Sequence, residues 1–344
     1  MEKNTEEERE GKKTEIKSIG REELLKRLFE GTGYENLRLQ LFSNNENLYS
    51  MSCSMMLEGI DFDLVYTPLK HLGYKAVLSA IGELYAKGYS PVGLWCNIGL
   101  SARFTAEDVV LLWSGMVAAA REHSVKSLSL DLTSSLTGLA IAISAQGEMS
   151  RKVASKLPAI EENSLLCITG NLGAAYMGLH VLEREKAMFD KLSGEEATKY
   201  VQPDLSKYKY ILSQYLSPEI NPKMVEQFKE AELFPSTGIF IKRGLAGAVI
   251  QICRESGMGA RIFLEKIPIA SQTMEFSKEI NIEAVTAALN GGDDYKFLFA
   301  IPLAEHEKFH LEFPNMDVIG HLTKRQENAT LVTPHGEEIK IVTL

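Results

Sequence analysis

The sequence predicts an α/β fold in which sheets and helices form layers, divided into two domains. Strand-like and helix-like segments alternate along most of the chain, as in sheets covered by helices. The 344 residues are 45% hydrophobic, which allows a large buried core and favours two domains over one. A polar stretch at residues 150–163 reads as a junction, so we expect domains at 14–150 and 151–344 after a charged, disordered tail at 1–13.

The first predicted domain mixes strands with two long helices. Its strands are expected at 47–56, 91–101, 127–132 and 139–147. Apolar residues recur at helical spacing from Leu72 to Leu84, which predicts a helix over 72–88 that ends at Gly88. A second, amphipathic helix is expected over 106–123.

The second predicted domain has the same mixture of elements. Strands are expected at 165–168, 261–267 and 295–301, with a terminal hairpin in 330–344. Helices are expected at 174–186, 244–256 and 282–289, and further surface helices in the tyrosine-rich stretch 190–224. Tight turns are expected at 169–173 and at the small residues 257–259.

Composition excludes several classes of function. The formal net charge is -9, from 46 acidic residues against 37 Lys plus Arg, which argues against binding nucleic acid or anionic lipid. No apolar run is long enough to span a bilayer, and the polar start of the chain does not resemble a signal peptide. The cysteines are too dispersed for a C-x-x-C pair, so we expect a cytoplasmic protein. They are Cys53, Cys96, Cys167 and Cys253.

One short motif suggests zinc but lacks the context that a zinc site needs. Residues 306–310 read H-E-K-F-H, which would place His306 and His310 on one face of a helix. The segment is only about two turns long before Pro314, and no downstream third ligand stands out. We therefore interpret it as a solvated helix face.

Three other segments place polar residues where strands end. Asp131 follows a predicted strand and suits magnesium or phosphate, but equally a turn cap. The turn 169–173 begins a helix whose N–H groups could receive an anion, although many α/β turns look alike. The third segment, Gly291-Gly292-Asp293-Asp294-Tyr295, combines flexible glycines with paired acids. A functional loop and a helix cap followed by a turn are equally favoured interpretations of it.

Taken in order, these segments resemble the thiamine-monophosphate kinase family over nearly the whole chain, from about residue 14. The segments that carry the resemblance are 57–63 (LEGIDFD), 73–91, 169–175 (TGNLGAA), a weakened match before Ala246, and 290–299. The resemblance implies a two-domain fold shared with aminoimidazole ribonucleotide synthetase. It also implies phosphoryl transfer from ATP to thiamine monophosphate, a homodimer, and nucleotide and dimer contacts in the first domain.

The chain departs from the family pattern mainly at acidic positions. The family's first aspartate-bearing turn corresponds to Ser43–Glu46, which has no aspartate, and the family's next aspartate is replaced by Ser54. A family histidine is replaced by Asp61, and an aspartate on the following helix by Glu83. Phe240 and Arg243 stand where the family has two further acids, and the position of an arginine expected from the family falls near Leu157.

The resemblance implies roles for the residues that remain. Glu83 and Asp131 are the expected catalytic and magnesium-holding acids, and Asp131 also belongs to the expected nucleotide contacts. Those contacts further include Thr169, Gly170, Lys242 and Arg243. The expected substrate contacts are Asp61, Asp293 and Asp294.

Fewer acids should weaken catalysis, because phosphoryl transfer depends on charge neutralisation by magnesium. We expect a thiamine-monophosphate-kinase-like protein, weak or inactive in this copy. The alternative is a non-catalytic paralogue that binds a nucleotide, a phosphate ligand or a protein partner. Lys242 and Arg243 would contact phosphate directly in that case, with no magnesium between, or else point to solvent. ATP and Mg²⁺ enter only through the resemblance, and the sequence leaves open whether the chain is an enzyme.

Overall fold

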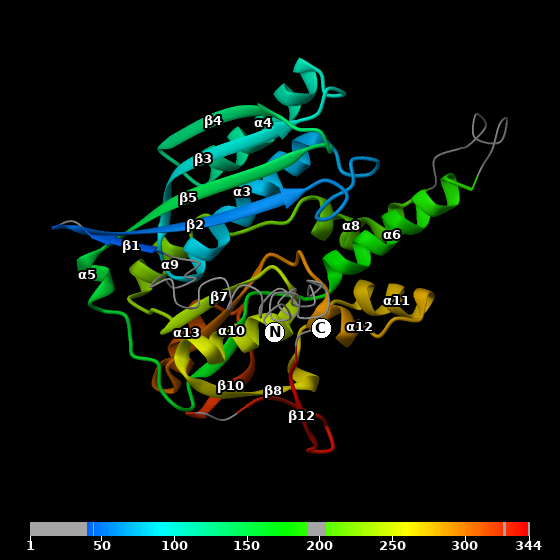
Figure 1. Ribbon diagram of the computed structural model, residues 1–344. Coiled ribbons are helices and arrows are strands. Elements are labelled where there is room, and N and C mark those ends of the chain that lie inside the picture. The colour runs from blue at the N-terminus through cyan, green and yellow to red at the C-terminus, as the bar shows by residue number, and fades with distance from the viewer. Residues whose placement is uncertain (1–39, 44, 192–203, 326–327, 343–344) are drawn as a thin grey trace, which may run out of the picture. The chain divides into compact units, whose positions relative to one another are not determined.

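Two β-sheets with their covering helices make up the part of the chain that can be described (Figure 1). The structure is a computed structural model and describes residues 40–43, 45–191, 204–325 and 328–342. The predicted tail at 1–13 lies outside the described residues. Mixed sheets and helices confirm the predicted α/β fold class.

The first sheet has the strand order β1-β2-β5-β3-β4. Its strands are β1 (Gln40–Ser43), β2 (Asn47–Leu57), β3 (Ser90–Leu100), β4 (Ser127–Ser134) and β5 (Ala140–Ser150). Only β3 and β4 pair in parallel, while the other neighbours are antiparallel. All four strands predicted for this half are confirmed, with β1 added at the edge.

Helices α3 (Leu69–Ala86) and α4 (Ala106–Glu122) cover one face of this sheet only. Because side chains alternate along a strand, Cys96 of β3 faces the helices and is buried, while its neighbour Trp95 faces away. Thr105 caps α4 through a capping box with Asp108, which explains why the helix begins where the sequence predicts. The opposite face of the sheet carries no covering helix among the described elements.

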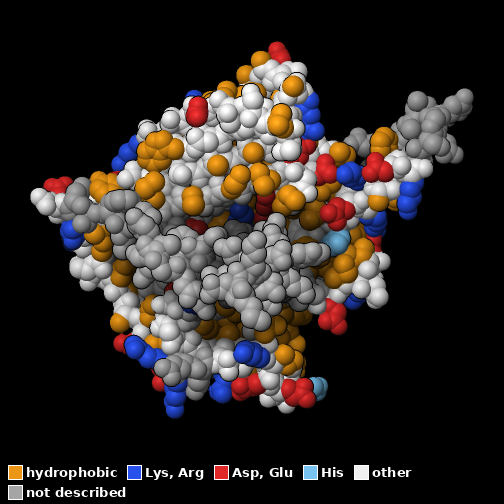
Figure 2. All heavy atoms as spheres, in the orientation of Figure 1, with side chains coloured by type: hydrophobic (Ala, Val, Ile, Leu, Met, Phe, Trp, Pro, Cys, Tyr) orange, Lys and Arg blue, Asp and Glu red, His pale blue; other side chains and the backbone are white. Residues whose placement is uncertain are grey.

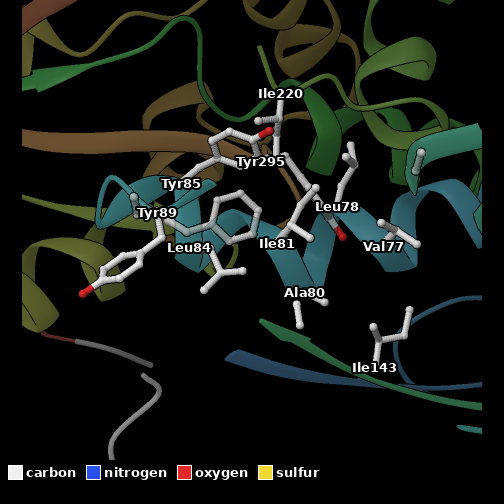
Figure 3. Close-up of a cluster of buried hydrophobic side chains, with 14 of the residues drawn as sticks. Val77, Leu78, Ala80, Ile81, Leu84, Tyr85, Tyr89, Ile143, Ile220 and Tyr295 are labelled. Atoms are coloured by element: carbon white, nitrogen blue, oxygen red, sulfur yellow. The ribbon is translucent and has the colours of Figure 1, made fainter. Parts of the chain in front are cut away.

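Helix α3 is buried on nearly all sides, from Leu72 to Ala86. One side packs on β2 and β5 of the first sheet, and the other meets residues of the second sheet region. Figure 3 shows Ile143 of β5 on one side of the helix and Tyr295 and Ile220 on the other. A continuous apolar surface is the reason that α3 lacks the amphipathic pattern of a surface helix.

The second sheet has the order β12-β11-β8-β10-β6-β9-β7. Its strands are β6 (Leu165–Ile168), β7 (Thr237–Ile241), β8 (Met258–Phe263), β9 (Lys296–Ile301), β10 (Asp317–Arg325), β11 (Ala329–Val332) and β12 (Glu338–Lys340). The neighbours are antiparallel except β11 and β8, and β11–β12 is the predicted hairpin.

The second half of the chain contributes eight α-helices to the described residues, of which α10 packs on β7, β8 and β11 of this sheet. They are α5 (Arg151–Ala154), α6 (Ala174–Phe189), α8 (Lys209–Leu216), α9 (Met224–Ala231), α10 (Gly244–Ser256), α11 (Ser271–Ile280), α12 (Ala284–Asn290) and α13 (His306–Glu312). The described residues also form short 3-10 helices at Ser206–Tyr208, Leu264–Lys266 and Leu303–Glu305. The predicted turn at 257–259 is wrong in part, because β8 already starts at Met258. The strand predicted at 261–267 therefore begins earlier than expected, and it ends four residues before the predicted end.

The first sheet ends at Ser150 and the second begins at Leu165, which brackets the predicted junction. The division into domains at 150 and 151 stays a prediction. Among the described residues, no helix is both long and apolar enough to cross a membrane.

Candidate functional site

The loop between α12 and β9, residues 291–295, is the centre of the candidate site. Asp293 and Tyr295 have φ angles of 63° and 53°, a region that side chains other than glycine rarely adopt. Their N–H groups donate to the carbonyl oxygens of Lys242 (2.9 Å) and Ile241 (3.2 Å), which hold the unusual backbone in place. Such strained, over-determined loops cluster at functional sites.

Asp293 forms an ion pair with a lysine inside the protein. Its Oδ2 lies 2.9 Å from Nζ of Lys75, whose side chain is only 3% exposed. The same ammonium lies 3.9 Å from the centre of the Tyr215 ring, a cation–π contact. Asp293 therefore balances a buried charge of the chain itself.

Asp294 points the other way and caps α6. It is 2% exposed and accepts hydrogen bonds from the N–H groups of Gly173 (2.9 Å) and Ala175 (3.3 Å). Burial raises the pKa of this carboxyl to about 7, although both N–H bonds act in the opposite direction. The N–H groups that were predicted to receive an anion at this turn thus already bind Asp294, which corrects that part of the prediction.

Lys242 reaches the position where the resemblance expects an acid. Its Nζ donates a hydrogen bond to Oγ of Ser54 (3.1 Å), and that hydroxyl lies 2.6 Å from Oγ of Ser79 on α3. The lysine is partly buried, whereas Arg243, the residue before α10, is exposed. A short polar network headed by an ammonium thus joins β2, α3 and the end of β7.

Phe240 fills the space beside this network. Its side chain is 3% exposed, and its ring packs so closely on Gly82 that a Cβ at residue 82 would come within 2.5 Å of Cε1. The ring also meets Tyr295 edge to face, with centroids 5.3 Å apart. The Phe240 ring can therefore occupy this position only because residue 82 is a glycine without a side chain.

Glu83 and Asp131, the predicted metal-holding pair, lie on opposite faces of the first sheet. Glu83 is buried in α3, which covers one face. Asp131 is exposed on β4 opposite Asn97, and the preceding residue, Leu130, packs against the core, so the carboxylate faces away from α3. The structure therefore does not bring the two carboxylates together within one chain, and their role in holding a metal ion stays a prediction.

The donor set does not fit magnesium elsewhere either. The described residues hold no group of three or more His, Cys, Asp or Glu side chains that could bind a metal ion. His306 and His310 of α13 have ring centroids 6.3 Å apart and are not part of any such group. Magnesium requires several oxygen ligands in octahedral geometry, and an ammonium at Ser54 repels a cation.

The other predicted contacts have mixed outcomes. Asp61 is exposed and accepts a hydrogen bond from the N–H of Leu57 (2.8 Å), so it closes a turn. Its role with substrate stays a prediction, as do those of Lys242 and Arg243 with phosphate. Asn44 of the first expected acidic turn lies outside the described residues.

A separate cavity of about 870 Å³ opens beside the same loop. It lies between the α3–α4 pair, the segment 217–222 and the residues after α13, and Tyr295 and Lys296 form part of its wall. Thr169 lines it, and the stem of Lys296 would be 3.7 Å from a Cβ on Gly170. Of the two predicted nucleotide contacts, Thr169 thus lines this cavity and Gly170 lies beside its lining residue Lys296.

Comparisons with known proteins give a consistent result. The family described as AIR synthase related protein, N-terminal domain, matches residues 37–149. Thiamine-monophosphate kinase of Synechococcus elongatus is 23% identical over 278 residues, covering 80% of this chain and 79% of that protein. The enzyme of that name from Buchnera aphidicola subsp. Schizaphis graminum is 26% identical, covering 89% and 88%.

Solved structures show the same fold. AaThiL complexed with AMPPCP and TMP matches with a TM-score of 0.76 at 17% identity, covering 95% of this chain and 97% of that one. The hydrogenase maturation protein HypE in complex with ATP matches with a TM-score of 0.61 at 16% identity, covering 96% and 93%.

Proposed function

We propose that the chain acts as a divergent member of the thiamine-monophosphate kinase family, with which its sequence and its fold agree. The protein is thiamine-monophosphate-kinase-like. In our proposal it binds a nucleotide or another phosphate-bearing ligand and transfers phosphoryl groups slowly or not at all.

The arrangement of Phe240 and Lys242 carries this proposal. Phe240 is packed against Gly82, and the Lys242 ammonium is hydrogen-bonded to Ser54, at positions where the resemblance expects carboxylates. A cation and an aromatic ring cannot hold magnesium. We therefore derive no catalytic step through a metal, and the proposal does not need one.

The direct test is a turnover assay with purified full-length protein, ATP, Mg²⁺ and thiamine monophosphate, following thiamine diphosphate. We expect a rate far below the ~1–1000 per second of ordinary enzymes. A rate within that range would overturn the proposal and would show that the chain is a working kinase. A thiamine-monophosphate kinase from Synechococcus elongatus, assayed in parallel, controls for the reagents.

Direct binding of phosphate by Lys242 is the finer part of the proposal. A charge-assisted hydrogen bond from an ammonium needs no metal, so ATP should bind equally well with Mg²⁺ and with EDTA in calorimetry. Lys242→Met should weaken ATP binding, whereas Lys126→Met, at an exposed surface lysine, should not. Loss of ATP binding on chelation would contradict this part alone.

We also propose a homodimer formed through the uncovered face of the first sheet. In Figure 2 hydrophobic side chains are spread over the region of β2, β3 and β5, with few charges among them. Met55 is 59% exposed and Trp95 is 39% exposed on this face, and Asp131 shares it. A second copy would bury this apolar surface and would bring Asp131 to the interface.

Sedimentation analysis tests the dimer. The wild-type chain should sediment as a dimer at micromolar concentration, and Trp95→Glu should give a monomer by placing a charge in the interface. As a control, Leu311→Glu on α13, 79% exposed but away from this face, should leave the dimer intact. A monomeric wild-type protein would overturn this element of the proposal.

A further inference from the structure

Lys296 is a lysine at a cavity with no counterion in contact. Among the described residues its ammonium makes no hydrogen bond and no ion pair within 4.0 Å. It lines the 870 Å³ cavity at the start of β9, and burial lowers the pKa of its ammonium. A partly buried charge without a partner is costly, so an anion that enters the cavity gains more here than at the surface.

The inner wall of the cavity is suited to an organic molecule. Thr169 provides a hydroxyl that accepts a hydrogen bond from the N–H of Phe297 (3.0 Å) and keeps its own proton to donate. Ile220, Phe297 and Pro218 are buried lining residues that offer apolar surface. An ammonium and a hydroxyl among apolar walls resemble the few polar groups that orient a ligand in a small-molecule site.

The acids around the cavity leave the ammonium available. Asp294 and Glu219 lie close enough to raise the pKa of Lys296, but neither contacts it. Asp294 is bound to the start of α6, and Glu219 is exposed, where solvent screens it. Two further lining acids are exposed: Glu122, which accepts a hydrogen bond from the Tyr74 hydroxyl (2.8 Å), and Glu312.

We propose that this cavity is a second ligand site, for a small organic anion with an apolar body, whose carboxylate or phosphate contacts Lys296 and Thr169. The site is separate from the Lys242–Ser54 network and does not depend on the proposed function. Its ligand reaches Lys296 from the α3–α4 side, whereas Asp293 and Lys75 are already paired with each other.

The first experiment is calorimetry of the full chain with three probes: phenyl phosphate, benzoate and benzyl alcohol. We expect saturable binding of at least one anion and at least tenfold weaker binding of the neutral alcohol. The first two probes distinguish a phosphate site from a carboxylate site. Equal affinity for the alcohol and both anions, or no binding of either anion, would overturn the proposal.

Variants assign the anion contact to Lys296. Lys296→Met should weaken anion binding at least tenfold, and Lys296→Arg should retain it, while Lys126→Met serves as a control for lost surface charge. Each variant is accepted only after its circular dichroism and melting temperature match those of the wild type. Unchanged affinity in a folded Lys296→Met protein would refute the assignment.

Methyl NMR of methionine-labelled wild-type protein locates the probe without any variant. Met224 and Met316 line the cavity, whereas Met258 lies in the core of the second sheet and Met55 on the uncovered face of the first. The anion should shift the first two signals only. Shifts confined to Met55 would show adsorption on the apolar sheet face and would overturn the proposal.

Discussion

Lys75 and Lys296 flank the same loop but differ in how their charges are balanced. Lys75 lies 2.9 Å from Asp293 and under the ring of Tyr215. Lys296, directly after the loop, faces a cavity and has no ion pair among the described residues. One side of the loop is thus closed by internal contacts, and the other is open to a ligand.

The closed side shows how a protein adapts to the loss of acids. Where the resemblance expects carboxylates, at positions 240 and 54, the chain has an aromatic ring that fills space and a serine that accepts a hydrogen bond from Lys242. These contacts stabilise the fold without needing an ion. The open side has no such compensation, so the two sides should respond differently to substitution.

Phe240→Ala should have the largest effect. Removing a fully packed ring between α3 and β7 leaves a cavity and should cost about 3–5 kcal/mol of unfolding free energy. Urea unfolding measures it. A cost under about 1 kcal/mol would mean that the closed side is not packed as described.

Gly82→Ala serves as the partner in a double-mutant cycle with Phe240. Alone it should cost about 1–3 kcal/mol, because its Cβ meets the ring. In the Phe240→Ala background that cost should vanish. Gly247→Ala, in α10 with nothing within 4 Å, is the matched control and should stabilise by about 0.5–1 kcal/mol.

Asp294→Asn should change how stability depends on pH. The pKa of Asp294 is about 7 in the folded chain against 3.8 in the unfolded one, so the folded state holds the proton more tightly. Its contribution is therefore complete below about pH 4 and is lost as pH rises through 7. At about 1.4 kcal/mol per pKa unit, the loss is at most about 4 kcal/mol by pH 8.

The asparagine has no proton to lose, so the variant should lack this fall in stability. Urea unfolding at pH 5, 6, 7 and 8, compared between wild type and variant, isolates the effect from other titrating groups. Parallel pH profiles would show that the carboxyl of Asp294 does not titrate in this range.

Asp293→Ala should cost about 3 kcal/mol, because it leaves the Lys75 ammonium buried without its partner. The double variant with Lys75→Met should recover much of that loss. Glu148→Ala, which breaks the exposed pair with Lys126, is the control and should cost under about 1 kcal/mol. Chemical denaturation compares these proteins with the wild type, and equal losses at both pairs would show that the Lys75–Asp293 pair stabilises the fold no more than a surface pair does.

Lys296→Met should have the smallest effect on stability, within about 0.5 kcal/mol of wild type or slightly stabilising. The ammonium makes no contact that holds the fold, and the methionine stem keeps the packing against Gly170. If Lys296→Met lowered the melting temperature as much as Asp293→Ala does, Lys296 would have a structural partner, and its charge would not differ from that of Lys75 in the way described.

Much of the fold follows from the sequence because the local signals are strong. Strand β6 and helix α10 begin and end where the pattern predicts, since glycine turns and apolar runs mark them. Strand β7 was missed, because its residues Thr237–Ile241 follow Pro235 and Ser236 without a clear alternation. The resemblance to thiamine-monophosphate kinases is confirmed by the comparisons.

The site was less predictable, because it depends on which side chains meet across the fold. The sequence identified the loop of Asp293 and Asp294, but not that Lys75 and the start of α6 already bind them. Lys75 carried a signal, since it and Glu83 are the charged residues within the apolar run from Leu72 to Ala86. The separation of Glu83 and Asp131 by a sheet appears only when strand alternation is combined with helix placement.

The burial of α3 from Leu72 to Ala86 has a consequence for the history of the chain. From Leu72 to Ala86 the helix has almost no surface left for water and packs against both sheets. Gly238 of β7 fits against it only because it lacks a side chain, since a Cβ there would lie 2.4 Å from the Ala86 carbonyl oxygen. A fragment ending at Ser150 would expose this apolar helix and aggregate. The two halves therefore cannot be exchanged separately between relatives by recombination: whichever half is replaced, α3 and its matching surface must come together.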